Sequence, residues 1–228
     1  MHENLSTRLG EIRQRIAESA AKSGREADAV TLLAVTKKVP LEVLREARYL
    51  GLLLFGENKV QEAKVKIPEL PANLRWHMIG HLQSNKARDA VHLFDMIHSV
   101  DSPALARDLN KWADHFSKTT KILLEVNVSG ESSKFGLPPE TLPATAEMIN
   151  ALPRLECHGL MTLAPYAEDP EKSRPHFARL RELRDHLEST LGLRLPVLSM
   201  GMSGDYQVAI EEGSTLVRIG TALFGKRQ

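Results

Sequence analysis

The sequence predicts an α/β fold in which eight parallel strands and the helices between them close into a (β/α)8 TIM barrel. The first observation is that short apolar runs of β character alternate with helical patterns along the whole chain. The second is that most of these runs are apolar at successive positions, which is typical of strands buried on both faces. No linker or low-complexity stretch interrupts the pattern, so we expect a single domain over residues 1–228. An open doubly wound sheet is the alternative, because pattern alone does not reveal closure.

The eight expected strands are 30–36, 52–56, 75–80, 96–100, 121–128, 155–163, 196–200 and 215–219. The helices expected between them are 41–50, 59–67, 84–94, 102–116, 140–152, 177–191 and 205–212. Their ends carry recognisable signals. Gly51 and Gly192 end two helices, and Ser102 before Pro103 is a good N-cap followed by proline at the first helical position.

An extra helix is expected before the first strand. Its apolar stripe at helical spacing consists of Leu5, Leu9, Ile12, Ile16 and Ala20. Because the chain stops soon after the eighth strand, no eighth helix is expected there. We expect the N-terminal helix to cover the barrel where that eighth helix would lie.

Composition excludes several classes of partner. The chain has 30 basic and 29 acidic residues, a net charge of +1 that gives no footprint for nucleic acid or an anionic membrane. No run approaches the length of a membrane span, and the start of the chain lacks the apolar core of a signal peptide. A single cysteine, Cys157, fits a reducing compartment. We therefore expect a cytoplasmic protein, and a monomer, because no apolar stripe is left over after the core is assigned.

Lys37 is the most informative residue, because it ends the first expected strand. Taking an ammonium group out of water costs several kcal/mol unless it is paired or loses its charge. One use for that cost is a neutral amine that attacks a carbonyl and forms a Schiff base. The alternative is that Lys37 and Lys38 mark the start of a solvated loop.

Other polar residues follow the strands whose carboxyl ends would share one mouth of the barrel. Ser199, Ser203 and Gly204 lie at the end of strand seven, and Gly220 and Thr221 at the end of strand eight. Hydroxyls and glycine N–H groups at these two positions are typical of phosphate sites in barrels.

The alternation of side chains along each strand predicts that an arginine also lies at this mouth of the barrel. Arg218 shares a strand face with Gly220, and Lys37 shares a face with Val35. If both faces point inward, closure of the barrel brings Arg218 and Lys37 together. The alternative is that Arg218 faces a helix and pairs with a surface carboxylate. A lysine, a phosphate cradle and an inward arginine describe a pocket for a phosphorylated aldehyde, for which pyridoxal 5′-phosphate (PLP) is the obvious candidate. Arg218 would face the pyridine nitrogen.

Six motifs carry a resemblance that extends in order over nearly the whole chain. They are AVTK at 34–37, FGEN at 55–58, HMIGHLQSNK at 77–86, HGLM at 158–161, LSMGMS at 198–203 and VRIGT at 217–221. Together they resemble the pyridoxal phosphate homeostasis protein (YggS/PROSC) family. One departure is Gly204, where many relatives have a polar or acidic residue.

The resemblance implies a barrel of PLP fold type III, like the N-terminal domain of alanine racemase. It implies Lys37 as the cofactor lysine, with the cofactor lined by Asn58, Ser199, Ser203, Arg218, Gly220 and Thr221. It also implies a carrier or regulator of the vitamin B6 pool without an established reaction, whose partners would be PLP and PLP-dependent apoenzymes. A second lysine, Lys38, follows Lys37 directly, so a minor PLP adduct on Lys38 is an open alternative.

A PLP-dependent racemase of low activity is the first alternative function. Racemases of this fold use a tyrosine from a C-terminal β domain as a second base, and we expect no such domain here. An arginine facing the pyridine nitrogen would also discourage protonation of the ring. The tyrosines Tyr49, Tyr166 and Tyr206 lie in or near helices and a loop. We therefore expect a protein that holds the cofactor and is not an enzyme.

A Schiff-base (class I) aldolase is the second alternative, with Glu57 as the nearest obvious carboxylate. We expect Glu57 to order the loop after strand two instead. A metal enzyme using His77 and His81 is disfavoured, because on a strand these residues lie about 13 Å apart. His81 is a candidate for capping the loop over the cofactor. Residues 131–136, after strand five, either fold over the site or form a plain solvated loop.

Overall fold

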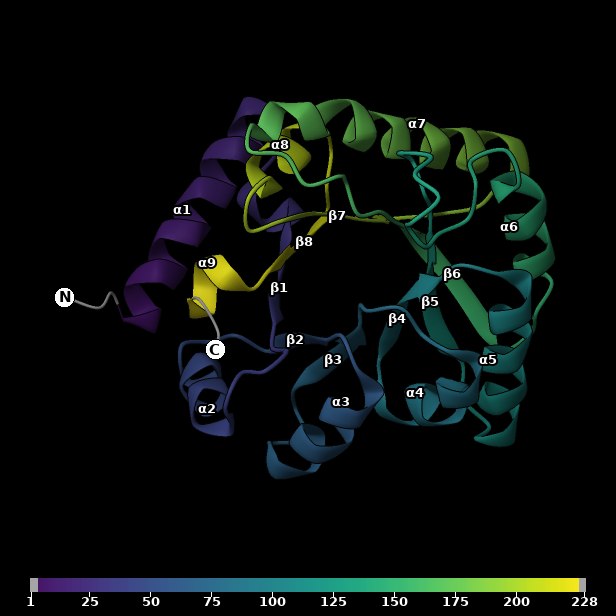
Figure 1. Cartoon of the computed structure of the whole chain (residues 1–228), viewed down its shortest axis with the longest axis horizontal. Helices are drawn as coiled ribbons and strands as arrows, with labels where there is room; N and C mark the ends of the chain where they lie inside the picture. The colour runs from purple at the N-terminus through teal and green to yellow at the C-terminus, as the bar shows by residue number, and fades with distance from the viewer. Residues whose placement is uncertain (1–3, 226–228) are drawn as a thin grey trace.

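The computed structural model describes residues 4–225, and its eight parallel strands form a closed barrel in the order β1 to β8, with β8 pairing to β1. The strands are β1 (Thr31–Val35), β2 (Leu54–Glu57), β3 (Arg75–Met78), β4 (Met96–Val100), β5 (Thr120–Glu125), β6 (Leu155–Met161), β7 (Val197–Met202) and β8 (Leu216–Ile219). Figure 1 shows these strands as an inner ring with the helices outside it. The predicted barrel is confirmed, and the open sheet is wrong.

The helices of the described residues follow the strands in the expected alternation. They are α1 (Leu5–Lys22), α2 (Leu41–Tyr49), α3 (Val60–Lys66), α4 (Ala87–Leu93), α5 (Pro103–His115), α6 (Leu142–Asn150), α7 (Arg174–Leu191), α8 (Tyr206–Glu211) and α9 (Thr221–Phe224). The expected end signals are present: the Ser102 hydroxyl accepts from the N–H of Leu105, and Gly192 ends α7 in the left-handed region. One difference is α9, a single helical turn after β8 where no helix was expected.

The N-terminal helix α1 lies against α8 and α9 (Figure 1). Its apolar stripe is buried as predicted. Lys22 pairs with Glu211 at 3.1 Å, and Arg25, just beyond the helix, donates to the carbonyls of Ile210 and Ser214. Helix α1 therefore covers the barrel beside β8, in the place expected of an eighth helix.

The interior of the barrel is filled by side chains from alternate strand positions. Leu33, Val35, Ile79 and Leu216 form one apolar cluster there. A Cβ at Gly56 would collide with the side chain of Leu33, so glycine at this position makes room for that side chain. Met96, Leu123 and Met161 form a second cluster on the other side of the lumen.

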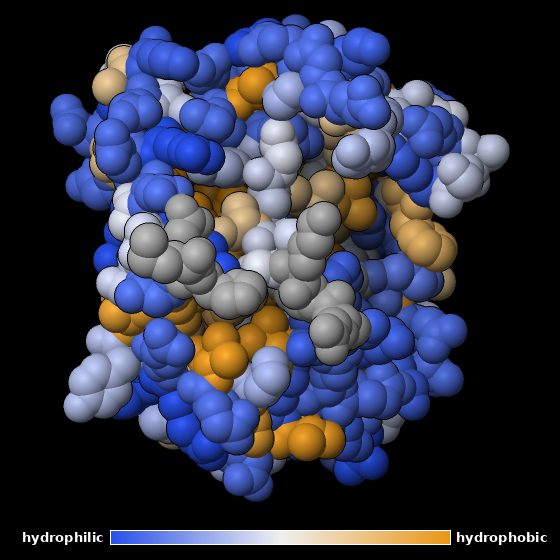
Figure 2. All heavy atoms as spheres, turned by 60° about the vertical axis from the view of Figure 1, so that its left-hand side comes forward, coloured by the Kyte–Doolittle hydropathy of each residue, from blue (hydrophilic) through white to orange (hydrophobic). Residues whose placement is uncertain are grey.

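The outer surface is mainly polar. Figure 2 shows the side of the molecule near α1 as mostly hydrophilic, with separate hydrophobic spots. Of the large hydrophobic side chains that are exposed in the described residues, Phe135, Leu163 and Met202 line one cavity. No helix in residues 4–225 is long and apolar enough to cross a membrane.

Candidate functional site

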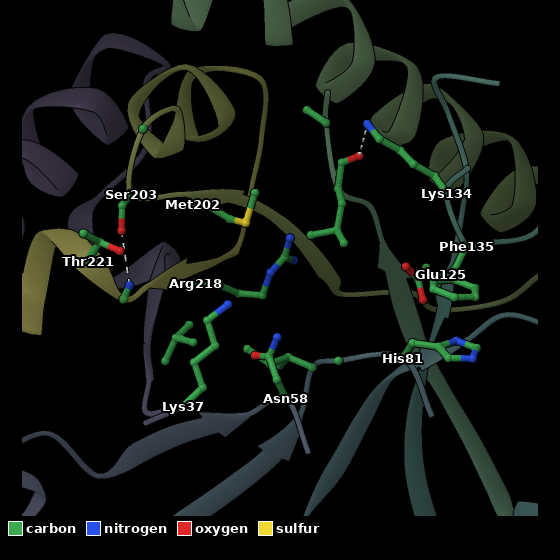
Figure 3. A pocket seen from close by; sticks show the side chains of 17 residues that line it. Lys37, Asn58, His81, Glu125, Lys134, Phe135, Met202, Ser203, Arg218 and Thr221 are labelled. Atoms are coloured by element: carbon green, nitrogen blue, oxygen red, sulfur yellow. Dashed lines mark hydrogen bonds between the residues drawn. The ribbon is translucent and has the colours of Figure 1, made fainter. Parts of the chain in front are cut away.

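A cavity of about 610 Å³ opens at the carboxyl ends of the barrel strands. This is the end at which barrel proteins carry their sites, and the volume lies in the range of small-molecule pockets. Its walls come from residues at the ends of β1, β2, β3, β5, β6, β7 and β8. Figure 3 shows side chains from opposite sides of the barrel pointing into it.

Lys37 lines the cavity two residues after the end of β1 (Figure 3). Its side chain is exposed, so the desolvation cost expected from a buried strand end is not incurred. The turn continues through Lys38, which has a positive φ of 57° and donates its backbone N–H to Glu62 at 2.8 Å. Lys38 is not among the residues that line the cavity, so the turn separates the two lysines.

Asn58 lines the cavity beside Lys37, immediately after β2. Gly80, after β3, also lines the cavity and lies close to the Asn58 backbone. A Cβ at Gly80 would collide with the Asn58 carbonyl oxygen. Glycine at this position therefore lets the β3 loop approach closely enough to fix the position of Asn58.

The turns after β7 and β8 meet at one end of the cavity. Ser203 Oγ accepts from the backbone N–H groups of Gly220 and Ala222, both at 3.2 Å, and Thr221 lies beside it (Figure 3). Ser203, Gly204, Gly220 and Thr221 all line the cavity. A concentration of N–H and hydroxyl groups of this kind suits an anion such as a phosphate.

Arg218 points from β8 into the barrel, as the alternation of side chains along the strand predicted. It lies level with Leu33 of β1, its partner in the strand register. The alternative, in which Arg218 faces a helix, is wrong. One guanidinium nitrogen donates to Ser199 O at 2.7 Å and Ser199 Oγ at 2.6 Å, and the other donates to Thr162 O at 2.8 Å. Burial lowers the pKa of Arg218 to about 10, so it stays charged at neutral pH.

Beneath Arg218, a chain of hydrogen bonds crosses the barrel lumen. Ser199 Oγ lies 3.0 Å from Nδ1 of His98, and Nε2 of His98 lies 2.9 Å from Nδ1 of His77. Burial lowers the pKa of both histidines, that of His77 to about 4. Both rings are therefore neutral near pH 7, and they hold Ser199 against Arg218 without adding charge.

Glu125 is the one carboxylate among the cavity-lining residues of the described chain. It stands at the end of β5, is only 4% exposed, and its Oε2 has no hydrogen-bond partner among residues 4–225. Burial raises the pKa of Glu125 to about 7, and the charge of Asp101 acts in the same direction. The arginine in the lumen opposes this shift only in part.

The loop after β5 forms the wall beside Glu125. Phe135 stacks on the ring of His81 with centroids 3.6 Å apart, and His81 Nδ1 lies 3.1 Å from an oxygen of Asp101. Lys134 turns toward the Leu163 carbonyl at 3.5 Å (Figure 3). Lys134 and Phe135 of the 131–136 segment thus line the cavity, which agrees with the alternative that this loop folds over the site.

The structure does not place the residues of the metal and aldolase alternatives where those functions need them. His77 lies in the barrel lumen and His81 at the cavity wall, and residues 4–225 contain no group of three potential metal ligands. Glu57 is fully buried away from the cavity. It accepts from Thr36 Oγ1 at 2.6 Å and from Lys66 at 2.8 Å, which orders the ends of β1 and β2 as expected.

The cavity brings together six of the seven residues predicted for a cofactor. These are Lys37, Asn58, Ser203, Arg218, Gly220 and Thr221. Ser199 lies one layer deeper, fully buried, with its hydroxyl bonded to Arg218 and His98.

Sequence reasoning missed Glu125 and His98. The signal for Glu125 was a carboxylate inside the expected strand 121–128, preceded by a run of apolar residues. The signal for His98 was a histidine inside a strand that is otherwise apolar on its inward face.

The comparisons with known proteins agree with this geometry. The family model described as "Alanine racemase, N-terminal domain" matches residues 8–228. Proteins named "Pyridoxal phosphate homeostasis protein" are similar to this chain: one from Aquifex aeolicus is 45% identical and covers 99% of both chains, and one from Pseudomonas aeruginosa is 44% identical and covers 98% of this chain and 96% of its own.

Solved structures of similar proteins have the same barrel fold. A structure of PipY from Synechococcus elongatus, described as having PLP bound, is 39% identical with a TM-score of 0.86, covering 97% of this chain and 100% of that one. Alanine racemase from Corynebacterium glutamicum shares the fold, with 16% identity and a TM-score of 0.72 over 96% of this chain and 62% of that one. The chain therefore belongs to the alanine racemase N-terminal domain family, and within it to the pyridoxal phosphate homeostasis proteins.

Proposed function

We propose that this chain binds PLP in the cavity at the carboxyl end of the barrel and takes part in intracellular vitamin B6 homeostasis as a carrier of the cofactor. The observation that supports this most strongly is the meeting of an amine, an arginine and two hydroxyl- and N–H-rich turns in one cavity. The relative from Synechococcus elongatus, which carries PLP in its structure, adds independent support.

The residues present suit the chemical groups of PLP. Lys37 supplies an amine for the aldehyde, and Ser203, Gly204, Gly220 and Thr221 supply hydroxyl and N–H donors for the phosphate. Arg218 is held by Ser199 and by two backbone carbonyls, so its guanidinium is fixed when it faces the pyridine nitrogen. Asn58 completes the wall beside Lys37. When bound, PLP supplies an electrophilic carbonyl carbon and an electron-withdrawing ring.

A carrier role fits the charges around the ring position better than a catalytic one. Arg218 stays protonated near neutral pH, and a charged arginine opposite the pyridine nitrogen disfavours its protonation. None of Tyr49, Tyr166 and Tyr206 lines the cavity, so the base used by racemases of this fold has no counterpart there. The relatives are likewise named for homeostasis and not for a reaction.

The proposal extends to the domain organisation, oligomeric state, location and partners of the protein. The whole chain, residues 1–228, acts as one PLP-binding domain, works as a monomer in the cytoplasm, and delivers its cofactor to PLP-dependent apoenzymes. Sedimentation of the loaded protein tests the monomer. Transfer of PLP to a purified apoenzyme, followed through the recovery of that enzyme's activity, tests delivery.

The first experiment is a visible absorption spectrum of the full-length protein after addition of PLP and removal of the excess. We expect a yellow protein, and a Lys37→Ala variant that stays colourless. Lys38→Ala is the matched control, because Lys38 is next in sequence but does not line the cavity. We expect it to keep the band.

Borohydride reduction followed by peptide mapping then assigns the modified lysine, and an adduct on Lys38 alone would contradict the assignment. A wild-type protein that takes up no PLP would overturn the proposal. A chiral assay with alanine separates a pure carrier from a weak racemase.

A further inference from the structure

We propose that the Glu125 end of the cavity is a second ligand subsite, which binds a small primary ammonium ion with an apolar substituent. The two ends of the cavity differ in charge. Lys37 and Arg218 lie at one end, with the hydroxyl-rich turns. Glu125 lies toward the other end, beside Phe135 and His81. An anion and a cation would therefore bind at different ends.

The Glu125 carboxyl lacks the partner that its burial demands. Glu125 is 4% exposed, and its Oε2 accepts no hydrogen bond from the part of the chain that the structure describes. A buried carboxylate without a donor is costly, and the usual remedy is an ion pair or hydrogen bonds. The chain's own candidate donor, Lys134, instead contacts the Leu163 carbonyl at 3.5 Å and Glu131 at 3.6 Å. A ligand that carries N–H donors would satisfy Glu125.

A cationic ligand fits better than a neutral one, because the negative charge of a second carboxylate, Asp101, repels that of Glu125. Asp101 lies 3.1 Å from Nδ1 of His81, whose ring stacks on Phe135, and its charge raises the pKa of Glu125. A primary ammonium ion at Glu125 would relieve the repulsion between the two carboxylates. It would also supply three donors in a compact group.

The wall around Glu125 suits an apolar substituent on that ammonium. Phe135, Leu163 and Ala164 line the cavity there, and the Phe135 ring is 56% exposed. The exposed face of an aromatic ring also attracts a cation within about 6 Å of its centre. The ligand class is thus a small alkylamine, an amino acid or a lysine side chain.

The role of this subsite rests on the proposed function. In direct delivery, the acceptor's nitrogen would replace Lys37 Nζ at the aldehyde carbon of the cofactor, and the three protons of the acceptor's ammonium group would pass to Lys37. A subsite that holds an ammonium ion in the same cavity as Lys37 would select that acceptor and keep it beside the lysine.

The test is a calorimetric titration of the full-length protein with propylamine at pH 7.5, without added PLP. We expect saturable binding of propylamine to the wild type and binding at least about tenfold weaker to Glu125→Gln. Glu140→Gln, which removes an exposed carboxylate after the same strand, is the matched control and should bind like the wild type. Propanol, which lacks the charge, should not distinguish Glu125→Gln from the wild type.

Equal affinity of the wild type and Glu125→Gln for propylamine would overturn the inference. If Glu125→Gln does not fold, Phe135→Ala decides, because this side chain is largely exposed: a loss of about threefold or more supports the subsite, and unchanged affinity overturns it. PLP uptake by the same preparations separates the two proposals. A wild type that binds propylamine but takes up no PLP would sink the carrier function alone, and the converse would sink only the subsite.

Discussion

Glu125 is a residue whose ionisation opposes folding near neutral pH. Its pKa is raised from 4.5 to about 7, chiefly by burial, so the folded protein binds more protons than the unfolded chain between these values. Its contribution to stability is therefore present below pH 4.5 and is lost as the pH rises through 7. A shift of this size corresponds to on the order of 3 kcal/mol.

Glu125→Gln should remove this pH dependence, since glutamine resembles the protonated acid and does not titrate. We expect the variant to match the wild type in free energy of unfolding at pH 4.5 and to exceed it by on the order of 3 kcal/mol at pH 8. Urea unfolding of both proteins across this range measures the difference. The low pKa of His77 affects both proteins equally, so a difference that does not vary with pH would contradict the assignment to Glu125.

Single residues were predictable where chain geometry alone decides their direction. The alternation of side chains along a strand placed Arg218 inside the barrel, and the rule that sites lie at carboxyl ends placed Lys37 at the mouth. Ser199 was predicted to line the cofactor; it is fully buried and is not among the residues that line the cavity, a depth in the lumen that sequence does not give. The partners of Glu125 and His98 depend on strands far away in the sequence, so no local pattern indicates them.

At the scale of elements, a buried ion pair joins α3 to the ends of β1 and β2. Lys66 of α3 pairs with Glu57 at 2.8 Å and donates to the Thr36 carbonyl at 2.7 Å. Thr36 directly precedes Lys37, so this helix helps to hold the turn that carries the lysine. Breaking a buried pair by removing one partner typically costs about 3–5 kcal/mol.

Lys66→Met should lower the free energy of unfolding by about 3–5 kcal/mol, because it leaves Glu57 buried without a cation. It should also weaken PLP retention. Adding Glu57→Gln to this variant should restore part of the stability. Lys64→Met is the control on the same helix: its pair with Asp89 at 3.1 Å is exposed, and such pairs contribute about 1 kcal/mol or less. Equal losses in the two single variants, measured by urea unfolding, would argue against the buried pair.

The strands were predicted more completely than the loops that follow them. Continuous apolar runs reveal a buried parallel strand, so all eight strands lie where expected, within a few residues at their ends. The placement of the 131–136 loop depends on the stacking of Phe135 on His81, which comes from a different strand end. The single turn α9 has too few residues to show a helical period.

At the scale of the whole molecule, α1 covers the outside of the barrel beside β8 and is linked to the site through α9. It packs against α8 and α9, and α9 begins at Thr221, which lines the cavity. The apolar stripe of α1 was predictable from its period, and the stripe packs where it was expected, beside β8. Stability and cofactor retention should therefore both depend on a helix that contributes no residue to the cavity.

Leu9→Ala tests this dependence. Leu9 is 2% exposed, so its truncation should lower the free energy of unfolding by about 2–5 kcal/mol and speed the loss of PLP from the loaded protein. Gln14→Ala, on the exposed face of the same helix, should change neither. Urea unfolding and the decay of the visible band after dilution measure the two effects. If Leu9→Ala lowers stability but releases PLP at the wild-type rate, α1 only covers the barrel. A parallel loss of both would mean that its packing on α9 also holds the end of the cavity at Thr221.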